Sequence, residues 1–293
     1  MLIKEAHRRM QEELSFLYSS RESSTVSDWV MEELTGWTRS QRIVHHDTFL
    51  SSDQLATWST ALQELKQGRP VQYVLGHSWF CGMRFKVDER VLIPRPETEE
   101  LVECIVKESA GLAWENTYTP KALDIGTGSG CIAIALKKRL PNWEIHGMDK
   151  SESALQLARE NAMLLEAPIL WHEADILTEA RNDHFTGFDL IVSNPPYIPP
   201  RERHELSQQV VQHEPHMALF TTQEDPLEFY RAIVTFSHHH LLRGGQLWFE
   251  THMDYAQEVA TLLSKQEFEA VEVMQDMQKK DRIVRGKRVG TSL

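Results

Sequence analysis

From residue 121 onward, short apolar runs alternate with stretches of helical periodicity, and this alternation constrains the fold more than any other feature of the sequence. Strands that alternate with helices in this way build βαβ units. We therefore expect an α/β domain with a mostly parallel, doubly wound sheet of the Rossmann-like kind. The expected strands are residues 122–125, 144–148, 169–172, 190–193 and 246–249, and the expected helices are residues 130–140, 153–165, 227–242 and 255–265.

Two further strand-like runs close the chain, residues 270–274 and 282–289, and they predict a terminal antiparallel hairpin. Residues 1–70, by contrast, contain helical patterns only, with a break near Gly36. We expect a small bundle of three to five short helices there. One apolar stripe consists of Ile3, Ala6, Met10, Leu14 and Leu17, and another consists of Leu55, Trp58, Leu62 and Leu65, with Ser51 or Ser52 as its N-cap.

Residues 70–87 combine apolar and aromatic residues with two glycines, Gly76 and Gly82, which indicates a β-hairpin connector. Pro94 and Pro96 then end the extended chain, and the acidic residues that follow suit the first turn of a helix. We therefore divide the chain into an N-terminal helical domain at residues 1–70, a β-hairpin linker at residues 71–90 and a catalytic domain at residues 91–293.

Charge and composition exclude several classes of protein. The formal net charge of −12 disfavours stable binding to nucleic acid, because phosphate is repelled. The three cysteines are too few and too scattered for a disulfide framework or a zinc pair, and we expect them to be buried. Charged residues interrupt the N-terminus, and no apolar run approaches the ~20 residues that span a bilayer. We expect a cytoplasmic protein that acts as a monomer, without a membrane segment.

A glycine-rich loop follows the first strand of the sheet, in the place where open α/β sheets bind ligands. Its G-x-G-x-G spacing differs from the G-x-x-G ending of the dinucleotide fingerprint, so recognition of a pyrophosphate is the weaker interpretation. The acid at its start, Asp124, suits a ligand with ammonium and sulfonium charge, and S-adenosylmethionine has both. The candidate cofactor-binding residues of this loop are Gly126, Thr127, Gly128, Ser129 and Gly130.

Two acidic residues end the next two strands. Asp149 can accept hydrogen bonds from both ribose hydroxyls, as an acidic residue does in dinucleotide folds, and Asp175 could reach the adenine amino group. The alternative is structural: the glycines form a tight turn, and Asp149 caps the helix that starts near Ser151. Three such features at successive strand ends favour a cofactor site.

The fourth strand leads directly into Asn194, Pro195, Pro196 and Tyr197, the most specific motif of the chain. The prolines fix φ and remove backbone donors, so the loop presents acceptors only. A planar amide or exocyclic amine has two N–H donors, and the Asn194 side-chain oxygen and the Pro195 carbonyl can accept both. We expect Tyr197 to pack on the planar group and these residues to be catalytic and substrate-binding, although a proline-rich turn is the simpler reading of the motif alone.

The glycine loop, Asp149 and the Asn-Pro-Pro-Tyr motif together resemble Rossmann-type methyltransferases that modify planar nitrogens. Residues 91–99, with Gly76 and Phe80 upstream, narrow the resemblance to the release factor glutamine N5-methyltransferases of the HemK and PrmC type, and it covers essentially the whole chain. The resemblance implies a helical substrate-recognition domain, a hairpin linker and a catalytic domain. It also implies that the glutamine of the Gly-Gly-Gln tripeptide in class 1 peptide chain release factors is methylated.

The same resemblance assigns further residues. It places S-adenosylmethionine on the glycine loop, on Asp149, near Asp175 and Ile176, and on Asn194, and it places the substrate glutamine on residues 194–197. Residues 214–215, 224–225, 227–230 and 281–286 are also similar to family segments. The chain departs from the family pattern at residues 250–252, where Glu-Thr-His replaces Glu-Ile-Gly, and at Pro226, where a glycine is usual.

Three rival functions share part of these features. A ribosomal-protein glutamine methyltransferase would use the same motifs, and an N6-adenine nucleic-acid methyltransferase would use the Asn-Pro-Pro-Tyr motif on a flipped base. A non-enzymatic, cofactor-binding scaffold would be expected to have lost Asn194 or the glycine loop, and both are present.

Two conspicuous groups of side chains are not interpreted as sites. Residues 238–240 are three consecutive histidines, but neighbouring helical residues point about 100° apart, so we expect a solvated helix end and no metal site. The basic residues between 279 and 288 alternate with apolar ones, as on an exposed strand face.

Overall fold

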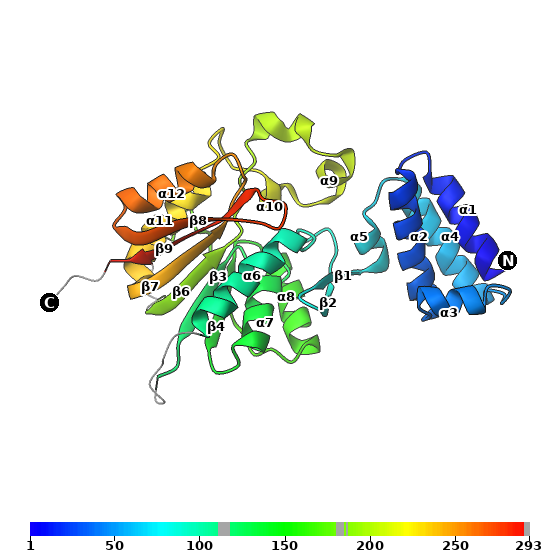
Figure 1. Ribbon diagram of the computed structural model, residues 1–293, viewed down its shortest axis with the longest axis horizontal. Helices are drawn as coiled ribbons and strands as arrows, with labels where there is room; N and C mark the ends of the chain where they lie inside the picture. The colour runs from blue at the N-terminus through cyan, green and yellow to red at the C-terminus, as the bar shows by residue number, and fades with distance from the viewer. Residues whose placement is uncertain (111–117, 180–184, 186, 290–293) are drawn as a thin grey trace. The chain divides into compact units, whose positions relative to one another are not determined.

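The computed structural model describes residues 1–110, 118–179, 185 and 187–289. The chain separates into two compact units, Met1–His77 with Ser207–His213, and Ser78–Leu206 with Glu214–Leu293 (Figure 1). The first unit is helical. Within Met1–His77, all of which is described, it contains five helices: α1 (Ile3–Leu14), α2 (Ser20–Thr35), α3 (Arg39–Val44), α4 (Ser52–Lys66) and α5 (Val71–Leu75).

Local sequence signals set the ends of these helices. Ser51 is the N-cap of α4, as expected, and its hydroxyl accepts a hydrogen bond from the Gln54 N–H. Gly36 ends α2 in the left-handed region, with φ at 66°. The expected apolar stripes are wrong at two residues, because both are exposed. Leu17 lies beyond the end of α1, and Leu55 lies in the first turn of α4.

The expected hairpin begins later than its sequence suggests. Val71–Leu75 forms the short helix α5, because Val71, Val74 and Leu75 have the spacing that turns them together onto the apolar core of the first unit. Gly76 ends this helix with φ at 71°. The hairpin itself consists of β1 (His77–Phe80) and β2 (Met83–Lys86), so strand pairing does not extend to residues 71–75.

The second unit carries the α/β fold. Its helices and remaining strands follow one another as α6 (Pro96–Ser109), β3 (Lys121–Ile125), α7 (Cys131–Arg139), β4 (Glu144–Asp149), α8 (Glu152–Leu164), β5 (Leu170–Glu173), β6 (Phe188–Ser193), η1 (Pro200–Glu205), α10 (His216–Leu219), α11 (Glu228–His240), β7 (Leu241–Glu250), α12 (Ala256–Lys265), β8 (Phe268–Gln275) and β9 (Asp281–Arg288). Helix α9 (Gln208–His213) belongs to the first unit.

The described strands of this unit form a seven-stranded sheet in the order β5-β4-β3-β6-β7-β9-β8. Pairing is parallel from β5 to β7, and β9 is antiparallel to both of its neighbours. The expected doubly wound sheet and terminal hairpin are thus confirmed. The strand order reverses between β3 and β6, and ligands of open α/β sheets bind outside the carboxyl ends of strands at such a point.

Alternation along the strands divides the core into two clusters, one on each face of the sheet. Leu190 and Val192 pack in the cluster that contains α6 and α7, whereas Ile191, between them, packs in the cluster that contains α11 and α12. Trp248 is flanked in the same way by Leu247 and Phe249. The sheet is therefore covered on both faces, with α6, α7 and α8 visible along one side of it in Figure 1.

Two expectations about polar residues are wrong. His240 is buried rather than solvated, and its Nδ1 bonds to the Phe185 carbonyl. The basic face of β9 is only half exposed, because Arg285 contacts Glu108 and Glu272, and Arg282 contacts Asp276. Of the three cysteines only Cys131 is buried, and Cys81 and Cys104 are half-buried. No helix in the described part of the chain is both long and apolar enough to cross a membrane.

Candidate active site

A cavity of about 180 Å³ lies at the carboxyl ends of β3, β4, β5 and β6. The sheet register places Ile125, the last residue of β3, opposite Ser193, the last residue of β6. The loops that follow these two strands therefore start side by side. Residues lining the cavity that the sequence singled out are Gly126, Gly128, Asp149, Asp175, Ile176, Asn194, Pro195 and Pro196.

The glycine loop needs glycine for two different reasons. Gly126 and Gly128 have φ values of 73° and 54°, and no atom of the described residues would meet a Cβ at either position within 4 Å. Backbone conformation alone therefore requires glycine there, and no side chain separates the backbone from the cavity. Gly130 also has a positive φ, and its Cβ would lie 3.0 Å from Cη2 of Trp171, so packing restricts it as well.

Thr127, Ser129 and Gly130 do not line the cavity, although they shape the loop. The Thr127 hydroxyl donates to Oδ2 of Asp124 at 2.6 Å, and the Ala133 N–H donates to the same oxygen at 3.2 Å. Asp124 is almost fully buried, and burial raises its pKa to about 7. This acid therefore links the glycine loop to the start of α7. We expected it to face the ligand, but it does not line the cavity.

Asp149 faces the cavity with hydrogen-bonding capacity left over. Its Oδ2 accepts the Gly128 N–H at 2.8 Å, and its Oδ1 accepts the Ser151 N–H at 2.9 Å. Burial raises the pKa of Asp149, while these backbone hydrogen bonds oppose the shift. The two carboxylate oxygens have two lone pairs each, so acceptor capacity remains for a ligand although the Lys150 N–H also acts on this group. The side chain that caps α8 is Ser151, whose hydroxyl accepts the Ala154 N–H at 3.2 Å.

Asp175 and Ile176 lie where the third of these strands ends. Asp175 pairs with Lys150, whose Nζ lies 2.6 Å from its Oδ2, and its Oδ1 accepts the Leu177 N–H at 3.0 Å. Ile176 is buried in the core cluster beneath α11 and also lines the cavity. Together they give this end of the cavity a charged edge beside an apolar wall.

Asn194 is held by side chains from two distant segments. Its Nδ2 donates to Oγ1 of Thr98 at 3.2 Å, and the Thr98 hydroxyl donates to Oε2 of Glu250 at 2.6 Å. Beside it, the Ser193 hydroxyl donates to the Ile125 carbonyl at 2.7 Å, which ties the end of β6 to the end of β3. The asparagine is therefore fixed relative to the glycine loop.

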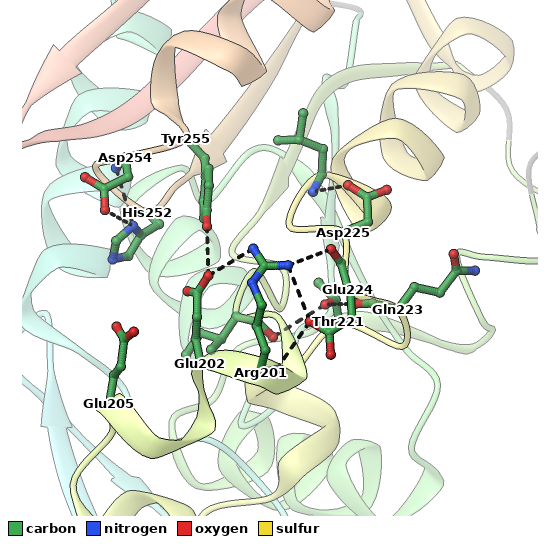
Figure 2. A network of polar contacts seen from close by, with 12 residues as sticks. Arg201, Glu202, Glu205, Thr221, Gln223, Glu224, Asp225, His252, Asp254 and Tyr255 are labelled. Atoms are coloured by element: carbon green, nitrogen blue, oxygen red, sulfur yellow. Dashed lines mark hydrogen bonds and ion pairs between the residues drawn. The ribbon is translucent and has the colours of Figure 1, made fainter.

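Tyr197 does not line this cavity. It lines a second hollow of about 350 Å³ with His252 and Tyr255, and its ring centroid lies 5.7 Å from that of His252. Figure 2 shows how the loop after the motif is anchored: the Tyr255 hydroxyl donates to Glu202, and Arg201 contacts both Glu202 and Glu224. The structure thus separates Tyr197 from the three motif residues that precede it.

Other residues of the cavity were not assigned a role from the sequence. Val91 and Leu92 lie before α6, and Phe229 and Ile233 lie on α11. Residues 215–222 contribute the rest of this wall, and the carboxylate of Glu214 before them accepts from the Ile93 N–H and from Arg95, at 3.2 and 2.5 Å. Resemblance to family segments was the only signal, since apolar lining residues form no chemical motif.

Comparison of the sequence with known proteins assigns the chain to a family. Residues 5–76 match the model of the PrmC N-terminal domain, and residues 101–219 match that of the methyltransferase small domain. The release factor glutamine methyltransferase of Flavobacterium psychrophilum is 40% identical over 97% of this chain and 99% of its own. The enzyme of that name from Bacteroides thetaiotaomicron is 37% identical over 95% of this chain and 98% of its own. The chain belongs to the release factor glutamine methyltransferase family.

Membership in this family makes the chain an enzyme of the methyltransferase class. Among solved structures, the catalytic domain of hMettl16 in complex with the MAT2A 3′UTR hairpin 6 is similar, with a TM-score of 0.52 and 14% identity, over 83% of this chain and 84% of that one. So low an identity shows a shared fold and nothing about the substrate. The family assignment rests on the relatives that match along the whole chain.

Proposed function

We propose that this enzyme transfers a methyl group from S-adenosylmethionine to the side-chain amide nitrogen of the glutamine in the Gly-Gly-Gln motif of class 1 peptide chain release factors. One observation carries the proposal: a single cavity joins the glycine loop and Asp149 to Asn194 and Pro195. Relatives that match nearly the whole chain are named for this reaction.

The half of the cavity that would hold the methyl donor has the groups that S-adenosylmethionine requires. The bare backbone at Gly126 and Gly128 allows close approach, and Asp149 retains lone pairs for the two ribose hydroxyls. We assign the adenine to the end of the cavity formed by Asp175 and Ile176. When bound, the sulfonium supplies an electrophilic methyl group.

The other half of the cavity, which would hold the methyl acceptor, suits a planar amide. The side-chain oxygen of Asn194 and the carbonyl of Pro195 can accept the two N–H groups of a glutamine, and the prolines offer no competing donor. An amide nitrogen is a poor nucleophile because its lone pair is conjugated. The enzyme must therefore accelerate methyl transfer by orienting the nitrogen toward the methyl group and by stabilising the charge that develops on it. Asn194 is neutral, and no general base is required beforehand: the amide nitrogen loses one proton to solvent after the methyl group has been transferred, and S-adenosylhomocysteine is the second product.

Tyr197 takes a different part in this proposal from the one expected. Because it lines the adjoining hollow, we propose that it supports the motif from behind and does not pack on the substrate amide. We further propose that the enzyme works as a monomer in the cytoplasm. A ribosomal-protein substrate or an adenine base would present similar donors, and the family membership of the chain favours the release factor over both.

The test is a methyl-transfer assay with labelled S-adenosylmethionine on four substrates: a release factor, the same factor with the tripeptide glutamine replaced by alanine, ribosomal proteins, and RNA. We expect label on the unmodified release factor alone. The Asn194→Ala enzyme should bind S-adenosylmethionine normally and lose about 10²-fold or more in transfer, because the acceptor that orients the amide is gone. Label on ribosomal protein or RNA, or full activity of Asn194→Ala, would contradict the proposal.

A further inference from the structure

Three polar side chains that lie far apart in the sequence form a continuous series of hydrogen bonds behind the half of the cavity that would hold the methyl acceptor. Thr98 lies in the first turn of α6, Glu250 is the last residue of β7, and Asn194 follows β6. Thr98 and Glu250 are each 3% exposed. The two bonds, of 2.6 and 3.2 Å, run from Glu250 through the Thr98 hydroxyl to the amide of Asn194. Neither Thr98 nor Glu250 lines the cavity.

While Glu250 is ionised, the chemistry of these groups fixes the direction of both bonds. An ionised carboxylate can only accept, so the single proton of the Thr98 hydroxyl is used in the short bond to Glu250. The Thr98 oxygen then has only lone pairs left for Asn194, and only the NH₂ of that amide can meet it. The reversed amide would set two oxygens face to face without a proton between them. The side-chain oxygen of Asn194 is therefore directed away from Thr98.

This direction is the one that the acceptor role demands. If the amide of Asn194 turned over, its NH₂ would meet the N–H groups of the substrate, and the acceptor would be replaced by a donor. We propose that Thr98 and Glu250 are positioning residues: Glu250 orients the Thr98 hydroxyl, which in turn holds the Asn194 amide with its oxygen toward the substrate. This inference rests on the proposed function, since it assigns Asn194 as the acceptor of the substrate amide.

The surroundings of Glu250 keep this arrangement rigid. The Tyr230 hydroxyl donates to the backbone carbonyl of Glu250 at 3.1 Å, and Glu250, which is 3% exposed, ends β7 and borders the second hollow beside Tyr197. The Thr98 N–H bonds to the Arg95 carbonyl at 3.1 Å, which fixes the start of α6. The backbone positions of Thr98 and Glu250 are thus fixed by α6 and β7.

The matched variants are Thr98→Val and Thr98→Ser. Valine keeps the branched shape of threonine and removes the hydroxyl, whereas serine keeps the hydroxyl and removes the methyl group. We expect Thr98→Val to lower kcat about tenfold or more with little change in KM for S-adenosylmethionine, and Thr98→Ser to stay within about threefold of the wild type. The control is Thr235→Val, an exposed threonine on α11 whose replacement should leave kcat unchanged.

The outcomes separate a positioning role from a structural one. A structural role predicts that Thr98→Ser, which leaves a small cavity, is impaired along with Thr98→Val and that both losses follow thermal stability. Full activity of a folded Thr98→Val enzyme would overturn the inference. Glu250→Gln is the second variant: its amide can turn a donor toward Thr98, so we expect a lower kcat in a folded protein, and an unchanged kcat would count against the role of Glu250.

The same experiment distinguishes failure of the inference from failure of the proposed function. If the wild-type enzyme labels the release factor and Thr98→Val does so equally well, only the positioning role is overturned. If the wild-type enzyme labels RNA or ribosomal protein instead, the proposed function is overturned, and the variants are compared on that substrate, where the same loss is expected. Absence of label on every substrate would overturn both.

Discussion

Two buried carboxyl groups near the cavity, Asp124 and Glu250, have pKa values raised to about 7, in each case chiefly by burial. Asp124 holds the glycine loop through Thr127, and Glu250 holds Asn194 through Thr98. Neither touches the cavity itself. At the scale of single residues, the site therefore consists of groups that would contact ligand and of acids behind them that determine which way those groups face.

The raised pKa of Glu250 predicts a pH dependence of methyl transfer. Burial raises this pKa first; the Thr98 hydrogen bond and the charges of Arg282 and Arg95 lower it, and Glu97 raises it, while Tyr197 and Tyr230 also face the group. The carboxylate enforces the orientation of Asn194, but the protonated acid can itself donate to Thr98 and release the constraint. We expect kcat to fall as pH drops through about 7, measured with both substrates saturating.

Glu250→Gln is the control for this profile, because it cannot titrate. Its kcat should be lower than that of the wild type above pH 7 and should vary less with pH, and any dependence that remains is assigned to Asp124 and Asp149, whose pKa values are also raised by burial. A wild-type kcat that is constant across this range would contradict the role given to the carboxylate.

At the scale of elements, the sequence was most informative where a pattern has a single physical cause. Alternating strands and helices, with Gly126 and Asn194 after two of the strands, predicted the cavity because parallel strands bring their carboxyl ends to one edge. Val71–Leu75 was misread because β-branched and aromatic residues also suit a short helix whose apolar positions are three and four apart. The link from Thr98 to Glu250 could not be predicted, since it joins residues 152 positions apart.

A glycine-to-alanine substitution would have different effects in strand β4 and in the loop after β3. A Cβ on Gly147 would lie 2.3 Å from Cζ3 of the Trp171 ring, whereas a Cβ on Gly128 would meet nothing but would need φ at 54°. We expect Gly147→Ala to lower the free energy of unfolding by about 1–3 kcal/mol through overpacking. Gly128→Ala should cost about 1–2 kcal/mol through backbone strain and should also weaken binding of S-adenosylmethionine.

Urea denaturation and calorimetric titration with S-adenosylmethionine measure these two effects. If Gly147→Ala were as stable as the wild type, Trp171 would not be packed against β4 as the structure shows. If Gly128→Ala bound the donor normally, the loop would not be its binding site.

At the scale of the whole molecule, the chain is two units with separate apolar cores. The helical unit has its own cluster around Met10, Val30 and Leu65, and the α/β unit has one cluster on each face of its sheet. The cavity lies entirely within the α/β unit. The chemistry thus belongs to one unit, and we propose that the helical unit recognises the protein partner.

Removal of residues 1–76, which leaves β1 intact and keeps Ser207–His213 as the remaining segment of the helical unit, tests this division of labour. We expect the shortened enzyme to bind S-adenosylmethionine and to methylate a short Gly-Gly-Gln peptide as well as the full chain does. Its kcat/KM on the intact release factor should fall about tenfold or more, because contacts to the partner outside the tripeptide are lost. Circular dichroism checks that the α/β unit stays folded, and unchanged activity on the intact factor would refute a recognition role for the helices.

If the cavity methylates one amide nitrogen of one protein, tandem mass spectrometry of a release factor after reaction with the enzyme and S-adenosylmethionine will locate the added methyl group. We expect a single added methyl group, located on the side-chain nitrogen of the glutamine in the Gly-Gly-Gln tripeptide. A methyl group on any other residue, or an unmodified tripeptide after reaction with folded enzyme, would contradict it.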